Sequence, residues 1–131
     1  MVNEVAESLD PVLRARLVDN LYVEAMVLAD EARAYFDGPG VEDRELLDVI
    51  QRLSFVCESL KVTTRMMHVI AWLLNQKAWR RGEIDAEAME HDRHRLGEVA
   101  PSDEESLDVM PVRAATLVRG SLSLYDRVWR L

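Results

Sequence analysis

Three histidines and one cysteine are the side chains in this sequence best suited to metal binding or nucleophilic chemistry. His91 and His94 are three residues apart, so on a helix their imidazoles would share one face. Two ligands bind a metal weakly, whereas a zinc site needs three or four, and Arg93 and Arg95 would repel a cation. Di-iron bundles place a Glu three residues before a His, which none of the three histidines has. A solvated polar face is the alternative, and we expect no metal and no cofactor.

His68 and Cys57 lie inside a long apolar segment. A phosphoryl-accepting histidine needs solvent and cationic support, whereas Met67 and Val69 flank His68. We therefore expect His68 to be buried or at an interface rather than to transfer phosphate. Cys57 lies on the main apolar row with acidic Glu58 beside it, so we interpret it as a small core residue rather than a reactive thiol. Without a catalytic constellation, the chain is not expected to be an enzyme.

The first helix that would position these residues is predicted over 10–37. Asp10 can cap its first turn, and Pro11 suits the first helical position because its missing N–H is not needed there. We expect Gly38, in the left-handed conformation, and Pro39 to end it. Its apolar or small residues recur in steps of three and four and define one face: Val18, Leu21, Ala25, Leu28, Ala32 and Tyr35.

The second helix, predicted over 43–81 and ended by Gly82, carries the strongest pattern and would span on the order of 58 Å. Its main row runs in unbroken four-three steps and is predicted to be core: Leu46, Ile50, Leu53, Cys57, Leu60, Thr64, Met67, Ala71, Leu74 and Ala78. Other apolar rows lie beside this one, and around 66–74 the helix is apolar nearly all round. We expect a homodimer to bury the surplus apolar face; a broad core within one chain is the alternative.

The remaining sequence predicts a minor polar helix at 85–96, a loop at 97–110 and a last helix at 111–131. The three main helices, arranged up-down-up, predict an all-α fold. We expect one domain over 1–131, an antiparallel three-helix bundle with a long central helix and a minor fourth helix.

Composition excludes several classes of function. The 131 residues carry a net charge of −8, so we expect no nucleic-acid partner. No segment is apolar for the roughly 20 residues of a membrane span, no signal peptide is evident and a single cysteine forms no internal disulfide. We therefore expect a cytoplasmic protein without a membrane partner. Residues 61–82 carry five bases and no acid, which suits contact with acidic helices or a partner, or solvated helix faces.

One segment resembles a known family. The run ESLKVTTRMM at 58–67, followed by AWLL at 71–74 and by Gln76, is similar to the central helix of the alphaproteobacterial "regulator of CtrA degradation" family. The turn YFDGPG at 35–40 and the sequence GEI at 82–84 match the ends of the family's first and second helices. The resemblance covers roughly residues 20–131 and is most specific from 58 to 83.

This resemblance implies a dimeric three-helix bundle that acts as a proteolytic adaptor. Such an adaptor joins the primed ClpXP protease to cell-cycle response regulators as cargo, and it catalyses no reaction. Simultaneous weak contacts raise the effective concentration of cargo. The alternatives are a dimeric helical interaction module unconnected with ClpXP, and a small phosphotransfer or metal-dependent enzyme. Some family members have a flexible tail after the third helix that helps engage cargo; here the sequence ends at Leu131, which puts delivery by a tail in question.

The resemblance supplies interface candidates rather than catalytic residues. Tryptophan and arginine often anchor protein interfaces, although a tryptophan among bases also suits a cation–π contact within the fold. The candidates on the matching segment are Lys61, Arg65, Trp72, Gln76 and Trp79.

Overall fold

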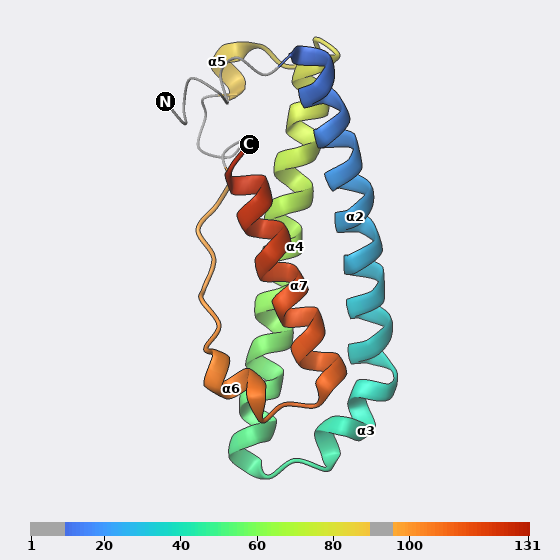
Figure 1. The fold of residues 1–131 in the computed structure, drawn as a ribbon, viewed down its shortest axis with the longest axis vertical. Helices are drawn as coiled ribbons and strands as arrows, with labels where there is room; N and C mark the ends of the chain where they lie inside the picture. Colours follow the sequence, from blue (N-terminus) through green and yellow to red (C-terminus); the bar gives the residue numbers. More distant parts are fainter. Residues whose placement is uncertain (1–9, 90–95) are drawn as a thin grey trace.

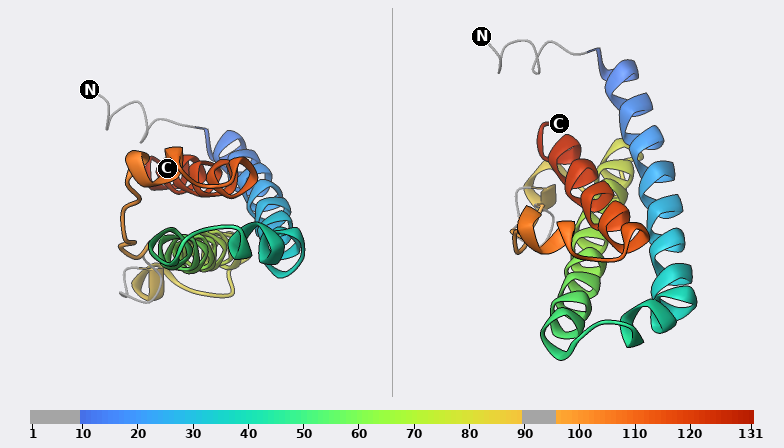
Figure 2. Two further views of the ribbon diagram at one scale, coloured as in Figure 1. Left: turned by 90° about the horizontal axis from the view of Figure 1, so that it is seen from below. Right: turned by 60° about the horizontal axis from the view of Figure 1, so that its bottom comes forward.

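Three long helices form an antiparallel bundle (Figures 1 and 2), which confirms the predicted all-α fold with its long central helix. The computed structural model describes residues 10–89 and 96–131, and no strand occurs among them. The long helices are α2 (Pro11–Asp37), α4 (Val49–Arg80) and α7 (Val112–Trp129). The short helices are α3 (Pro39–Glu45), α5 (Ala86–Met89) and α6 (Glu104–Asp108).

Helix α2 begins as predicted. The Asp10 carboxylate accepts a hydrogen bond of 2.8 Å from the Val12 amide, and Pro11 occupies the first turn. Its predicted apolar face is buried in the bundle except for Leu28, which is partly buried against the core. The sequence pattern of this helix therefore identified its packed face.

The connection between α2 and α4 differs from the prediction. Gly38 has a φ of −112° rather than a left-handed conformation. Pro39 opens the separate helix α3, because a proline in the first turn lacks only an N–H that has no partner there. The Tyr35 hydroxyl donates a hydrogen bond of 2.7 Å to Asp43, which ties α3 to α2.

The central helix therefore starts at Val49, later than the predicted position 43. A capping box fixes this start: Asp48 accepts a 2.7 Å hydrogen bond from the Gln51 amide, and the Gln51 side chain accepts one from the Asp48 amide. The predicted end is confirmed, since Gly82 follows the last turn with a positive φ of 76°. Helix α4 is 32 residues long.

The minor elements are also shifted. The predicted helix at 85–96 is described only as α5, where Asp85 accepts a hydrogen bond from the Ala88 amide; residues 90–95 lie outside the described part. The predicted loop at 97–110 contains α6, capped by Asp103. Pro111 precedes α7 as its cap.

The core lies between the three long helices, and it corrects the prediction for α4. The buried apolar side chains of α4 are Phe55, Val62, Met66, Val69 and Leu73. Phe55, Val62 and Val69 form one of the rows beside the main one, and none of the five belongs to the main row. The row predicted as core faces outward, because α2 and α7 both pack on the opposite side of α4, as the end-on view in Figure 2 shows.

Two further features would bear on function if the described residues contained them: a cluster of metal ligands and a membrane-spanning helix. In residues 10–89 and 96–131, no three or more His, Cys, Asp or Glu side chains are grouped closely enough to hold a metal ion. In the same ranges, no helix is both long and apolar enough to span a membrane.

Candidate interaction surface

The outward row of α4 is a regular feature that the other described residues leave uncovered. We call eight of its residues the outer stripe, and all eight are exposed: Ile50, Leu53, Cys57, Leu60, Thr64, Met67, Ala71 and Leu74. The larger members remain highly accessible, with Leu60 exposed to 62% and Met67 to 66%. Cys57, predicted to be core, is exposed here. Contiguous apolar surface of this kind marks a contact site in soluble proteins.

The spacing of the outer stripe is that of a coiled-coil seam. Its members follow one another in alternating steps of three and four residues, and none of the eight carries a charge. Such a heptad row lets two helices interdigitate along their length. Because one helix supplies the whole row, the same surface on a second copy would be complementary to it, as a two-fold interface requires.

Three hydroxyl groups on and beside the stripe donate hydrogen bonds within the helix. Thr64 donates a hydrogen bond of 3.1 Å to the Leu60 carbonyl, and Thr63 donates one of 3.1 Å to the Ser59 carbonyl. Ser59 donates to the Val56 carbonyl at 2.7 Å. These residues therefore present methyl or methylene groups outward while their oxygens bond within the helix.

An apolar groove of about 460 Å³ lies between α2 and α4, beside the outer stripe. Leu60 and Met67 belong to both the groove and the stripe. Ala29, Ala32 and Phe36 line the side formed by α2. The groove widens the apolar surface that a partner helix could cover.

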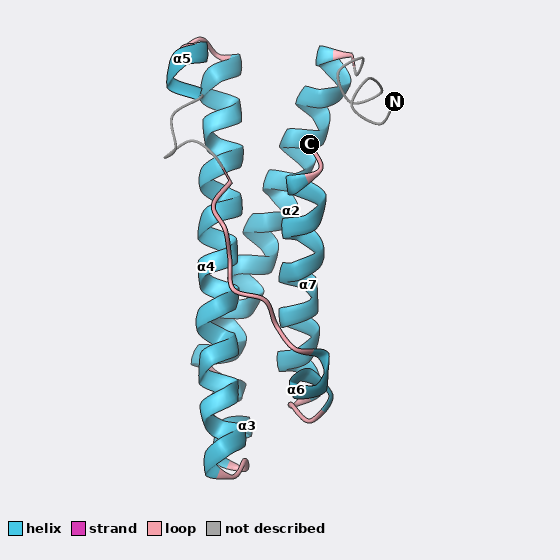
Figure 3. Ribbon diagram, turned by 90° about the vertical axis from the view of Figure 1, so that its left-hand side faces the viewer, coloured by secondary structure: helices cyan, strands magenta, loops and turns pink. Residues whose placement is uncertain are grey.

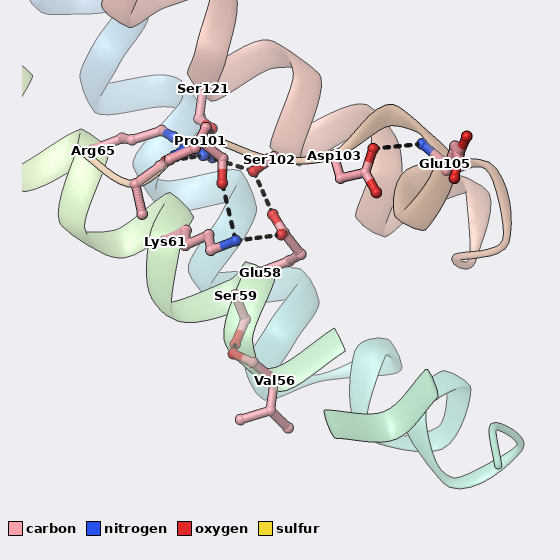
Figure 4. A network of polar contacts seen from close by, with 11 residues as sticks. Val56, Glu58, Ser59, Lys61, Arg65, Pro101, Ser102, Asp103, Glu105 and Ser121 are labelled. Carbon is pink, nitrogen blue, oxygen red and sulfur yellow. Dashed lines mark hydrogen bonds and ion pairs between the residues drawn. The ribbon is translucent and has the colours of Figure 1, made fainter. Parts of the chain in front are cut away.

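The opposite face of α4 contains a polar network (Figure 4). Arg65 is fully buried, and its guanidinium donates to the hydroxyls of Ser121 (3.2 Å) and Ser102 (2.6 Å) and to the Ala100 carbonyl (2.7 Å). Burial lowers the pKa of Arg65, and the charge of Glu58 opposes that shift. Ser102 donates a 2.5 Å hydrogen bond to Glu58, so its hydroxyl links the two charged groups.

Lys61 completes this network. Its ammonium group lies 2.9 Å from Glu58 and donates a 3.0 Å hydrogen bond to the Pro101 carbonyl. The contacts tie residues 97–103, which we call the strap, to α4. The strap runs as extended chain along α4 and α7 before it enters α6 (Figure 3).

The five interface candidates do not form one surface. Arg65 lies in the buried network, and Gln76 is buried and accepts a 2.9 Å hydrogen bond from Arg14. Lys61 is partly covered beside the strap, and Trp72 packs partly buried against the core. Trp79 is the exposed member, at 46%. None of the five belongs to the outer stripe.

The basic stretch of α4 meets acids within the chain. Arg80 donates a 2.8 Å hydrogen bond to Asp19 on α2, and the Lys77 ammonium lies 3.5 Å from the same carboxylate. Lys77 also lies 4.1 Å from the centre of the Tyr22 ring, a cation–π contact. Arg80 and Lys77 therefore support the interpretation that charged helices pack against oppositely charged neighbours. Lys61, by contrast, pairs with an acid of its own helix.

The histidines, which were the remaining candidates for metal binding or phosphate transfer, do not belong to the outer stripe. His68 is half-buried beneath the strap, so close to Gly97 that a Cβ added there would lie 2.1 Å from Nδ1. His91 and His94 lie outside the described residues. The sequence reasoning overlooked Ser102, Ser121 and Tyr125, which contact the strap or Arg65. Their only sequence signal was polarity within an otherwise apolar or loop segment.

Comparisons with known proteins agree with this fold. A family model described as "Protein of unknown function (DUF1465)" matches residues 9–131. The crystal structure of RcdA from Caulobacter crescentus CB15 is similar, with a TM-score of 0.69 and 35% sequence identity. The match covers 86% of this chain and 84% of that chain. No curated protein matches the chain. These findings confirm the resemblance noted from residues 58–83.

Proposed function

We propose that this chain, which belongs to the RcdA-like family described as "Protein of unknown function (DUF1465)", is a non-enzymatic adaptor in regulated proteolysis. As a cytoplasmic homodimer, it would deliver cell-cycle response regulators to the primed ClpXP protease. The likeness to RcdA supports the adaptor role. The outer stripe supports contact with another protein chain.

The likeness to RcdA carries the adaptor part of this proposal, and the outer stripe carries its dimer contact. A helix in a monomer of this size would ordinarily present charged residues to water, yet the outer row of α4 is uncharged over eight successive stripe positions. A second copy that covers this row would remove apolar surface from water, which stabilises the contact by about 25 cal/mol for each Å² buried. The heptad spacing gives that contact a defined register.

Association is tested with two matched variants. Leu60→Asp places a charge in the stripe, and Val23→Asp places one on the exposed side of α2. The two residues are exposed to 62% and 61% in the single chain. We expect sedimentation equilibrium to give a dimer for the unaltered chain and for Val23→Asp, and a monomer for Leu60→Asp. A dimer that survives Leu60→Asp would place the contact elsewhere.

The adaptor role is tested by reconstitution. Purified ClpXP, its priming regulator and a response-regulator cargo are combined with or without this chain. We expect faster loss of cargo with the chain present and no effect when the priming regulator is left out. If neither the unfoldase nor its priming regulator is retained by the immobilised chain, the adaptor role is wrong.

A dimeric interaction module unconnected with ClpXP is the second candidate function. The outer stripe favours it equally, because the stripe indicates a partner without naming one. The two candidates differ in the reconstitution. A chain that forms the Leu60-dependent dimer but leaves the degradation rate unchanged would be such a module.

A further inference from the structure

The strap is attached to the bundle mainly through its own backbone carbonyls. Lys61 donates to the carbonyl of Pro101, Arg65 to that of Ala100, and the Tyr125 hydroxyl to that of Gly97 at 2.5 Å. The donors belong to α4 and α7 and remain with the bundle whatever the strap does. Since a carbonyl is common to every residue, these three bonds do not depend on the side chains of the strap.

Two other features of the contact do depend on the amino-acid sequence of the strap. A Cβ at position 97 would clash with the His68 ring, so a residue larger than glycine fits there only if that ring moves. The hydroxyl at 102 both accepts from Arg65 and donates to Glu58. The side chains of Glu98, Ala100 and Pro101 are exposed.

The strap has little else to hold it. Its described part contains no helix or strand, and no residue of the strap belongs to the buried core. Arg65 and Glu58 would both gain water if the strap left, so opening would not leave a charge stranded in an apolar interior. Opening therefore exchanges a few hydrogen bonds for hydration, and the exchange of a hydrogen bond with water has a small net free energy.

From these contacts we propose that the junction of α4 and α7 is a binding site for an extended peptide, and that the strap is its internal ligand. The peptide that fits has a glycine and, five residues later, a serine or threonine. Acidic residues after the hydroxyl are compatible, as at Asp103 and Glu104 in the chain itself. A partner with such a segment would displace the strap and use the same donors.

The test measures binding of a fluorescent peptide to the full chain. The peptide copies residues 97–105, and the protein is either unaltered or carries Ser102→Ala. This substitution weakens the strap and leaves every donor on α4 and α7 in place. Because the competent fraction of sites sets the apparent affinity, we expect Ser102→Ala to bind the peptide about tenfold more tightly than the unaltered chain.

Two controls identify the site. In the Ser102→Ala background, Lys61→Met removes a donor to the peptide, whereas Lys77→Met removes a base paired with Asp19 on α2. We expect a loss of affinity of about threefold to tenfold for Lys61→Met and no change for Lys77→Met. A peptide with alanine in place of its serine should bind more weakly to the Ser102→Ala chain.

The proposal is overturned by either of two results, provided that circular dichroism shows the variants folded. The first is the absence of binding to Ser102→Ala at millimolar peptide, the range of effective concentration that a tethered segment supplies. The second is binding that Lys61→Met leaves unchanged. The measurement uses the purified chain alone, so its outcome is independent of ClpXP.

Discussion

A regular row of apolar residues on a helix is usually the buried face. On α4 the opposite holds, because the more regular row is on the outer face. The inner face is buried although it includes Glu58, Arg65 and Gln76. The outer stripe is exposed although it has the more regular apolar spacing. The position of α2 and α7 decides which face becomes core.

This difference suggests that the two faces of α4 have different roles. The inner face holds the chain together, and its polar side chains form hydrogen bonds with Ser102, Ser121 and Arg14. Among the described residues, the buried Nε of Arg65 has no hydrogen-bond partner. The outer face contributes little to the stability of one chain, because its side chains remain in water. A regular apolar row that residues 10–89 and 96–131 leave without a partner is therefore better explained by an intermolecular contact.

The strongest test of the comparison uses Cys57 as a probe of the outer face. An exposed thiol reacts in the native state, whereas a core thiol reacts only after unfolding. We expect a thiol reagent to modify the dilute native chain at least about 1,000 times faster than global unfolding would allow. Stopped-flow absorbance checks this, and a rate that matches unfolding would return Cys57 to the core. If the stripe is the dimer contact, the rate also falls as protein concentration rises.

Two neighbouring leucines give the next largest contrast. Leu73 is fully buried and Leu74 is exposed to 45%, although both are consecutive residues of α4. We expect Leu73→Ala to lower the free energy of unfolding by about 3 kcal/mol. Leu74→Ala should change it by less than about 1 kcal/mol in the monomer. Urea denaturation at low concentration measures both, and equal losses would contradict the assignment of the two faces.

Replacement of Arg65 should have a somewhat smaller effect. Arg65→Met retains much of the side-chain packing but removes the donors to Ser121, Ser102 and the Ala100 carbonyl. We expect a loss of about 2 kcal/mol in the free energy of unfolding, because buried acceptors lose their partners. The matched control is Arg130→Met, since Arg130 is exposed in a pair with Asp126 and should change stability by less than about 1 kcal/mol. A loss no larger than that of the control would mean that Arg65 is not a structural residue.

The smallest expected effect is the pH dependence of stability that two exposed ion pairs contribute. Hydrogen bonds from Arg80 and Arg127 lower the pKa values of Asp19 and Glu24, respectively. Because these pKa values are lower in the folded than in the unfolded state, the pairs stabilise the fold above the ordinary values of 3.8 and 4.5. That contribution is lost as the pH falls through the folded pKa values.

Urea denaturation between pH 3 and 6 measures this loss. We expect the double variant Asp19→Asn, Glu24→Gln to be less stable at pH 6 and to lose less stability on acidification. An unchanged pH dependence would show that other carboxylates determine the acid sensitivity. Since both carboxylates are close to solvent, the effect should also weaken at high salt.

The sequence was sufficient for the number, type and order of the long helices, because apolar spacing and caps such as Asp10 are local signals. It was insufficient to choose between two apolar rows of α4, since a single helix pattern does not reveal where its neighbours lie. The start of α4 was predictable in principle from the capping pair Asp48 and Gln51. The contacts of Arg65 with the strap join residues more than thirty positions apart, and no local pattern encodes them.

The hydroxyl group of Thr64 has a consequence for how the outer stripe sheds its hydration shell. Because this hydroxyl bonds to the Leu60 carbonyl, water beside the stripe has few strong sites to occupy. Removing that water when another helix approaches would leave the donor of the threonine hydroxyl still bonded to the Leu60 carbonyl. Thr64 therefore does not prevent water from leaving the stripe when a second helix packs on it. Association avoids the free-energy cost of burying a hydroxyl donor that has no partner.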